Sequence, residues 1–259
     1  MIFNIVSIFP QMFEGITNYG ITARAFEKEI CKLFTVNPRD FTKDKYHKVD
    51  DKGFGGSAGA VMKIEPLELA LNQAVSNLDQ QGVTKMRKIY LSPQGQRVDQ
   101  AMINSLVKDC DGMVLVCGRY EGVDERFIER NIDMELSVGD FVVSGGELPA
   151  MLLMDSIIRH LPNALNDETS ALEDSFMNGL LDFPHYTTPR TYKGDSVPEV
   201  LLSGDHKQIK RWQMQMSLWR TYLRRPDLLK LCKLTKEQSG LLDEMFWQDV
   251  AKASAKDKS

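Results

Sequence analysis

Three short segments combine glycine with polar or charged residues, and each directly follows an apolar run that predicts a buried strand. They are residues 91–95 (LSPQG), 117–122 (CGRYEG) and 144–147 (SGGE). Glycine lets a ligand touch the main chain, and ligands of open parallel sheets bind outside the carboxyl ends of the strands. The three loops could therefore offer backbone donors and acceptors to a purine, and carboxylates to a cationic group.

The run from residue 137 to residue 150 (SVGDFVVSGGELPA) is the most informative of these regions. Its apolar centre, Phe141-Val142-Val143, predicts a short buried strand with glycines on both sides. Pro149 is typical of the first turn of a helix, so a helix is expected to follow. Spacing alone fits two interpretations, a ligand pocket at the end of a strand or a tight strand-to-helix turn without a ligand.

The elements that would position these loops alternate between strand and helix patterns. This alternation predicts an α/β fold, in which a mostly parallel sheet carries helices on its faces. The predicted strands are 2–9, 32–36, 88–93 (stopped by Pro93-Gln94-Gly95) and 113–117. The predicted helices are 11–29 with a break at Gly20, one from Pro66, one across 102–110 and one from Pro149.

The chain changes character after residue 160. Residues 161–174 are polar and acidic, which predicts a mobile linker. A helix ended by Pro226 follows, and the residues of its apolar stripe, expected to be buried, are Ile209, Trp212, Met216, Trp219 and Leu223. Trp212 and Trp219 are therefore expected in a core rather than stacked on bases. The predicted organisation is an α/β domain (1–160), a linker (161–174), a helical domain (175–246) and a tail (247–259).

The charge is unevenly distributed along the 259 residues, although the net charge is only −4. Residues 120–189 hold 3 Lys or Arg and 14 Asp or Glu, whereas residues 190–230 hold 9 and 4. The basic segment could bind a polyanion, or it could be a solvated helical surface.

Four scattered cysteines predict reduced thiols rather than a zinc site. The absence of a long apolar run predicts a cytoplasmic protein without a membrane span.

Residues 53–58 (GFGGSA) match the dinucleotide-binding pattern G-x-G-x-x-G/A. That pattern requires a buried strand immediately before it, but here the charged residues 43–52 precede it. A nucleotide-dependent oxidoreductase is an alternative function that rests on this match alone. A glycine-rich, charged loop is better suited to a flexible cover over a bound polymer.

Several segments, in order from residue 7 to about residue 245, closely resemble the bacterial tRNA (guanine-N1)-methyltransferases that modify guanosine 37. The matching segments are 7–13 (SIFPQMF), 38–42 (PRDFT), 90–95 (YLSPQG), 117–126 (CGRYEGVDER), 138–150, 173–176 (EDSF), 184–187 (PHYT), 200–204 (VLLSG) and 223–226 (LRRP). Two positions depart from the family's usual pattern. The glycine-rich loop usually reads PYGGG where this chain has GFGGS at 53–57, and Thr188 replaces the usual arginine.

The resemblance implies the deep trefoil knot of the SPOUT-type methyltransferases, a fold in which the chain threads its own loop. It also implies S-adenosylmethionine (SAM) bound in the knot, and a homodimer whose active site lies at the subunit interface. The SAM-binding residues that it implies are Leu91, Ser92, Pro93, Gly118, Tyr120, Glu121, Val138, Gly139, Asp140, Phe141, Val142, Val143, Gly145, Gly146 and Pro149. Glu121 could bind the amino group of SAM or a Mg²⁺ ion, or it could form a surface salt bridge.

The resemblance also implies two catalytic residues. Asp174 would remove the proton from guanine N1, and Arg159 would stabilise negative charge on O6. By composition alone, Asp174 is one more acid in an acidic linker, and Arg159 suits the dipole at a helix end. A base carried on a linker would be placed only when tRNA orders that linker. The predicted tRNA phosphate contacts are Lys210, Arg211, Arg220, Arg224 and Arg225. A non-catalytic RNA-binding protein with the same fold is an alternative function that would need the same contacts.

Overall fold

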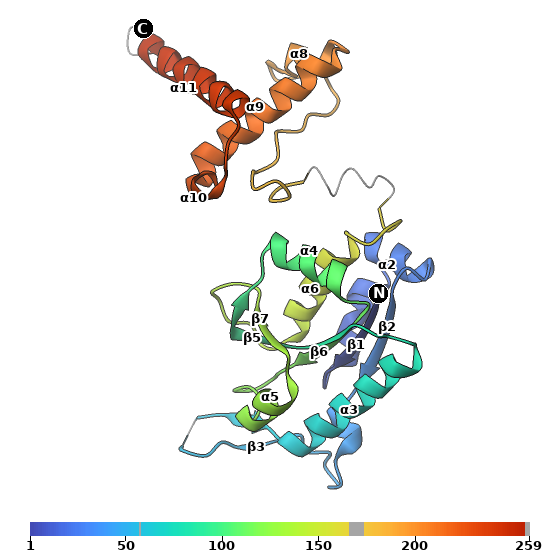
Figure 1. Cartoon of the computed structure of the whole chain (residues 1–259). Coiled ribbons are helices and arrows are strands. Elements are labelled where there is room, and N and C mark those ends of the chain that lie inside the picture. The colour runs from blue at the N-terminus through green and yellow to red at the C-terminus, as the bar shows by residue number, and fades with distance from the viewer. Residues whose placement is uncertain (57, 166–173, 257–259) are drawn as a thin grey trace. The chain divides into compact units, whose positions relative to one another are not determined.

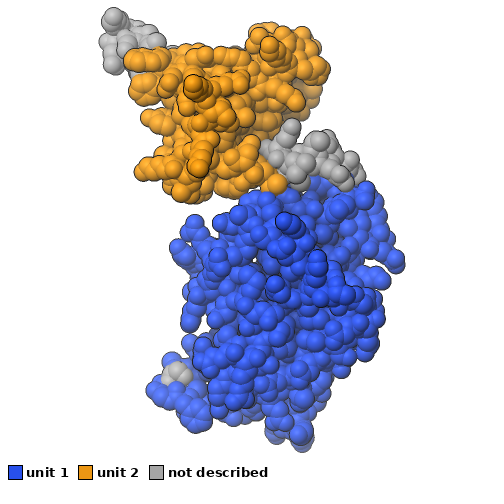
Figure 2. Space-filling model, in the orientation of Figure 1, with its two compact units in different colours: residues 1–171 blue, residues 172–259 orange. Residues whose placement is uncertain are grey.

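The computed structural model describes residues 1–56, 58–165 and 174–256, without the side chains of 250–256. The chain divides into two compact units, Met1–Ala171 (unit 1) and Leu172–Ser259 (unit 2) (Figure 2). Each unit has its own hydrophobic core. Most of the segment predicted as a linker, residues 166–173, lies outside the described residues.

Unit 1 is built around a five-stranded sheet in the order β2-β1-β6-β5-β7. The strands are β1 (Ile2–Val6), β2 (Lys32–Val36), β5 (Met86–Arg97), β6 (Gly112–Cys117) and β7 (Met134–Ser137). Every pairing is parallel, so all five carboxyl ends lie along one edge of the sheet. The predicted α/β fold with a parallel sheet is confirmed.

Helices cover both faces of this sheet (Figure 1). α3 (Ile64–Gln80) and α5 (Glu125–Asn131) share a core with Val114 and Val116 of β6. α2 (Gly20–Glu27), α4 (Gln100–Asp109) and α6 (Glu147–Ile158) share the opposite core with the alternate β6 residues. The central strand β6 is buried along its whole length because both of its faces are covered.

Smaller elements complete unit 1. The predicted helix 11–29 is divided into η1 (Pro10–Phe13), α1 (Glu14–Thr17) and α2, and Gly20 has the positive φ that marks the predicted break. η2 (Pro38–Phe41) follows β2. The glycine-rich segment connects the strands of an antiparallel hairpin, β3 (Asp50–Lys52) and β4 (Ala60–Met62).

The strand predicted to stop at Pro93 instead continues to Arg97. Its pairing with β7 shifts between Leu91 and Gln96, and both of these residues pair with Leu136. The irregular stretch contains Pro93, which has no N–H for a ladder bond and is tolerated at such interruptions. The expected stop is therefore a bulge within one longer strand.

The prediction of a strand at Phe141–Val143 is wrong. The strand in this region is β7, which ends at Ser137, and residues 138–146 form a loop. The Ser137 hydroxyl accepts from the Gly139 N–H (3.2 Å) and turns the chain away from the sheet. Phe141 and Val142 are 57% and 83% exposed, so this apolar run was misread as a buried strand.

Unit 2 is mostly helical. Its described residues contain a short hairpin, β8 (Thr191–Tyr192) and β9 (Asp195–Ser196), and four helices. The helices are α8 (Glu199–Leu202), α9 (His206–Arg224), α10 (Pro226–Leu231) and α11 (Lys236–Lys256). Leu180, Leu218 of α9 and Leu241 of α11 form the core, with Met214 packed against it.

The buried face of α9 differs from the predicted stripe. Leu218 and Thr221 are buried, whereas Leu223 is 59% exposed and Trp212 and Trp219 are half-buried. Trp212 packs on Tyr186 and Trp219 stacks on Tyr222. The Thr221 hydroxyl accepts from the Leu181 N–H (2.9 Å), which holds the preceding segment against this side of α9. The partner segments, not the total apolar content, select the face that is buried.

We predict that Leu218→Ala lowers the free energy of unfolding of unit 2 by about 2–5 kcal/mol, because it leaves a cavity in the core. Leu223→Ala, the matched change on the exposed side, is expected to cost less than about 1 kcal/mol. Urea unfolding followed by tryptophan fluorescence measures this, since all three tryptophans (Trp212, Trp219 and Trp247) lie in unit 2. Equal losses in the two variants would contradict the assignment of the core.

Candidate functional site

A cleft opens at the carboxyl ends of β5, β6 and β7. The loops that follow these strands form its walls, together with the start of α6. The predicted site residues among its lining are Leu91, Ser92, Pro93, Gly118, Tyr120, Glu121, Val138, Gly139, Phe141, Val142, Val143, Gly145, Gly146 and Pro149. Asp140 is outside this lining and lies 3.8 Å from Arg97 in an exposed ion pair. The structure thus brings together three loops that are far apart in the sequence.

The walls of the cleft meet through main chain. The Gly146 N–H donates to the Gly118 carbonyl at 2.9 Å, which joins the loop after β6 to the start of α6. A Cβ atom on Gly146 would lie 2.7 Å from Cα of Cys117, and one on Gly118 would lie 2.7 Å from the Tyr90 hydroxyl. A side chain at either position would therefore force the walls apart, so these glycines are required by close approach.

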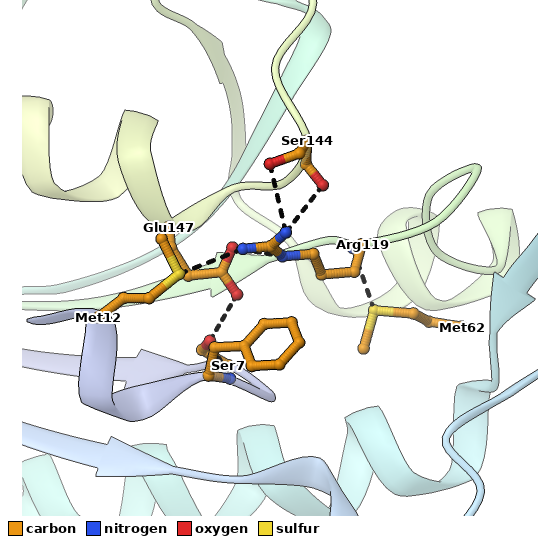
Figure 3. Close-up of polar contacts among 7 residues, drawn as sticks. Ser7, Met12, Met62, Arg119, Ser144 and Glu147 are labelled. Atoms are coloured by element: carbon orange, nitrogen blue, oxygen red, sulfur yellow. Dashed lines mark hydrogen bonds and ion pairs between the residues drawn. The ribbon is translucent and has the colours of Figure 1, made fainter.

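A buried ion pair lies in the cleft wall (Figure 3). The Arg119 Nε–H donates to Glu147 Oε2 at 2.8 Å, and the Ser7 hydroxyl donates to Glu147 Oε1 at 2.6 Å. The side chain of Glu147 has no exposure to water, and that of Arg119 is 15% exposed. Both carboxylate oxygens are therefore satisfied inside the protein, as a buried charge requires.

Arg119 connects this pair to further elements. Its Nη1 donates to the Ser144 carbonyl at 3.1 Å, and its Nη2 lies 3.2 Å from the sulfur of Met12. The guanidinium also lies over the ring of Phe9, 4.7 Å from the centroid. A Cβ atom on Gly145 would overlap the Arg119 side chain. One side chain thus joins the end of β1, the loop after β7 and the start of α6.

No pattern in the sequence predicts this network. The carboxylates after the strands are expected to serve a ligand, but Glu147 is occupied by Arg119 and Ser7. The available signal was a charged residue next to the small residues of a predicted strand-to-helix turn. Such a position is crowded, so a charge there has to find a partner of opposite sign.

Tyr90 closes the base of the cleft. It is 6% exposed, and burial raises the pKa of its phenol to about 12, with a further contribution from the negative charge of Glu135. Its hydroxyl forms a hydrogen bond with the backbone of Val123. The neighbouring Cys117 thiol is also neutral, because burial raises its pKa well above the usual range. Neither of these two groups is therefore charged at neutral pH.

The β3–β4 hairpin packs against the loop that carries Glu121. The Glu121 N–H donates to the Ala60 carbonyl at 3.0 Å, and the Met62 N–H donates to the Gly122 carbonyl at 2.9 Å. Phe54, in the glycine-rich loop between the two strands, is 99% exposed. A hairpin loop is not the strand–turn–helix context of a dinucleotide-binding pattern. The match at residues 53–58 therefore gives no support to the oxidoreductase alternative.

The two predicted catalytic residues lie in different units. Arg159 is the C-cap of α6 in unit 1, and its N–H donates to the Asp155 carbonyl at 3.1 Å. Asp174 lies in unit 2, where its half-buried carboxylate accepts from the Ser175 N–H at 2.8 Å. Arg159 thus lies at the end of a helix, and Asp174 lies just before a turn.

The predicted RNA contacts lie along α9 and at its end. Arg211 pairs with Glu244 of α11 at 2.8 Å, and Arg225 pairs with Asp227 at 2.7 Å. Lys210 and Arg224 are exposed and Arg220 is half-buried. Each ion pair reduces the positive potential at its own position, so Lys210 and Arg224 are the more available cations for a polyanion.

Neither a metal centre nor a membrane span is found in the part of the chain that the structure describes. No three His, Cys, Asp or Glu residues come together there in a group that could hold a metal ion. The Mg²⁺ prediction therefore has no structural support. Among the described helices, none combines the length and the apolar content needed to cross a membrane.

Comparisons with known proteins give a consistent result. A family model described as tRNA (Guanine-1)-methyltransferase TrmD matches residues 1–231. A tRNA (guanine-N(1)-)-methyltransferase of Nitrosospira multiformis is 52% identical over 245 residues, which cover 93% of this chain and 95% of that protein. Enzymes of the same name are 51% identical in Dechloromonas aromatica (95% and 97% covered) and 52% identical in Pseudomonas fluorescens strain SBW25 (93% and 94% covered).

We predict that Tyr90 contributes to the stability of unit 1 in a pH-dependent way. When the pKa of an acid is higher in the folded state than in the unfolded state, its full contribution to stability is present below the unfolded pKa, which is about 10 for tyrosine. That contribution is then lost as the pH rises through the folded value of about 12. Tyr90→Phe should therefore flatten the fall in stability between these two pH values.

Urea unfolding followed by circular dichroism across this pH range measures the effect. Tyr19→Phe is the matched control, because Tyr19 is 73% exposed. If Tyr90→Phe loses stability as steeply as the wild type, burial of this phenol does not cause the pH dependence.

Proposed function

Because the chain belongs to the tRNA (guanine-1)-methyltransferase family, we propose that it transfers a methyl group from SAM to N1 of guanosine 37 in the anticodon loop of tRNA. Methylation of guanine N1 in tRNA follows from the family; the donor, the position and the catalytic residues are the proposal. The glycine-walled cleft at the carboxyl ends of three parallel strands is the observation that carries it.

The cleft has the properties that SAM requires. Its adenosine part needs backbone donors and acceptors at close range, and Gly118, Gly145 and Gly146 leave the main chain accessible there. The whole predicted set, including Asp140 at the rim, would hold the ligand. SAM supplies a methyl group on a positively charged sulfur. Glu121, a lining residue, is a candidate partner for its amino group.

The chemistry assigns separate roles to Asp174 and Arg159. Guanine N1 carries a proton at neutral pH, so a base must accept that proton as the N1–carbon bond forms. The Asp174 carboxylate would take it, while the bond from the methyl carbon to sulfur breaks and leaves a neutral thioether. The negative charge that develops on O6 would be stabilised by the Arg159 guanidinium. Since Asp174 lies in unit 2, its placement would depend on bound tRNA.

Exposed apolar side chains support a homodimer. Leu148 and Leu152 lie one turn apart on α6 and are 50% and 51% exposed. Leu152 lines the same groove as Tyr19, which is 73% exposed, and the apolar loop with Phe141 and Val142 precedes the same helix. A large exposed apolar surface of this kind is typical of an interface. The trefoil knot and a cytoplasmic location stay predictions from the resemblance.

The basic residues of unit 2 would bind the tRNA backbone. Phosphate contacts by lysine and arginine supply much of the affinity of such proteins and make it dependent on salt. Guanosine 37 lies in a single-stranded loop, so little base-pairing energy opposes its extrusion into an active site. Lys210 and Arg224 are the first candidates for these contacts because they are exposed.

We expect that Asp174→Asn lowers the rate of methyl transfer by about 10²–10⁴-fold, because the amide cannot accept the N1 proton. SAM binding should be unaffected. Asp243→Asn is the matched control, an exposed acid of α11 in the same unit. Mass mapping of tRNA after incubation with labelled SAM measures both the rate and the modified position. A methyl group on another nucleotide would refute the proposed function, and a wild-type rate in Asp174→Asn would refute the assigned base.

We also expect the wild type to have the mass of a dimer in solution, measured by light scattering after gel filtration. The double substitution Leu148→Glu and Leu152→Glu should shift it toward the monomer, because it places charges on the proposed interface. Leu69→Glu, on the opposite side of the sheet at 39% exposure, is the control and should stay dimeric. A monomeric wild type at micromolar concentration would contradict the proposal.

A further inference from the structure

The ion pair between Arg119 and Glu147 is unusual because it is buried in a cleft proposed to bind a cation. Arg119 lines the cleft, and Glu147 lies behind it with no exposure. A buried ion pair often adds little to stability compared with apolar residues of similar size. Retaining one at this position therefore calls for a role other than stability.

Each polar group of the pair is occupied. Ser7 and Arg119 bind the two carboxylate oxygens of Glu147. The remaining guanidinium nitrogens of Arg119 contact Ser144 and the sulfur of Met12, which carry no charge. Among the described residues, Glu147 is the one acid in an ion pair with Arg119. Its carboxylate is thus the group that cancels the charge of Arg119.

This cancellation matters for ligands that differ by one charge. The donor carries a sulfonium, whereas its product, S-adenosylhomocysteine, carries a neutral thioether and is otherwise the same apart from the methyl group. An uncompensated guanidinium in the cleft wall would repel the sulfonium and leave the thioether unaffected. The interaction is felt across the cleft because a partly buried pair is screened weakly by solvent.

We propose that Glu147 is a specificity-determining residue, whose buried carboxylate neutralises Arg119 and so keeps the cleft from favouring the thioether product over the sulfonium donor. The proposal rests on the proposed function, since it assumes that SAM binds in this cleft. Other charged groups near the ligand, such as Glu121, also act on the sulfonium, but they are the same in all variants, so their contribution cancels when the ratio of the two affinities is compared between variants.

A purely positional role makes a different prediction. Glu147 begins α6, and Arg119 holds Ser144 in the loop before it, so a disturbed geometry would weaken both ligands. They share every group except the methyl-bearing sulfur. A positional role therefore leaves the ratio of their dissociation constants unchanged, whereas a charge role changes it.

The test is calorimetric titration of SAM and of S-adenosylhomocysteine into the full-length protein. Glu147→Gln keeps the size of the side chain and an oxygen that can accept from Arg119, and its NH2 group can donate to the Ser7 hydroxyl, but it removes the charge. We expect the ratio of Kd for SAM to Kd for S-adenosylhomocysteine to rise by roughly 3- to 10-fold. The double variant Arg119→Gln with Glu147→Gln restores neutrality and should return the ratio toward that of the wild type.

Glu65→Gln is the control for net charge, because Glu65 forms an exposed ion pair with Lys43 on the surface of unit 1. Its ratio should equal that of the wild type. An unchanged ratio in Glu147→Gln, or an equal loss of both ligands, would overturn the proposal. A wild type that binds neither ligand would instead refute the proposed function.

A second variant covers the case in which Glu147→Gln does not fold. Arg119→Gln removes the cation. The ratio is then expected to shift in favour of the sulfonium, or to stay at the wild-type value where the unpaired buried carboxylate takes up a proton. A shift in favour of the thioether would overturn the proposal as well. Circular dichroism of each variant establishes that it is folded before the titration.

Discussion

The burial of the Glu147 carboxylate is the constraint that organises the site. A carboxylate without access to water requires partners at both oxygens, and the chain provides them from two distant segments, Ser7 after β1 and Arg119 after β6. Both partners must stay in place for the charge to remain satisfied. The start of α6 is therefore tied to the ends of two strands, and the loops between them are held at fixed distances.

The same ion pair explains why glycines are needed in the cleft wall. With Arg119 extended across the wall toward Ser144, no side chain fits at Gly145, and none fits at Gly146 beside the backbone of Cys117. At these two positions the main chain itself faces the ligand. A surface of backbone amides and carbonyls can recognise the edges of a purine, which agrees with an adenosine-containing methyl donor.

The sequence predicted four of the five strands of the sheet, because apolar runs bounded by turn residues mark them, but it did not predict β7. The strand at residues 32–36 agrees with β2 in both bounds, and that at residues 113–117 lacks only the first residue of β6. An apolar run alone does not say whether its residues are covered, which is why Phe141–Val143 was misread. The prediction of the buried face of α9 was wrong for a related reason. Burial of Leu218 depends on Leu180 and Leu241, which come from elsewhere in the chain. The Arg119–Glu147 pair spans 28 residues, and no local pattern encodes such a contact.

The two proposed catalytic residues lie in different units, and this affects how they can be brought together. Arg159 follows the last residue of α6, and Glu147 is the first, so the helix connects the anchored ion pair to the proposed cation over roughly 18 Å. Because α6 is buried against the sheet, Arg159 is fixed relative to the cleft before any substrate binds. Asp174 belongs to the other unit. Under the proposed mechanism, the RNA held by the basic residues of unit 2 would set the base against the cation at the end of α6.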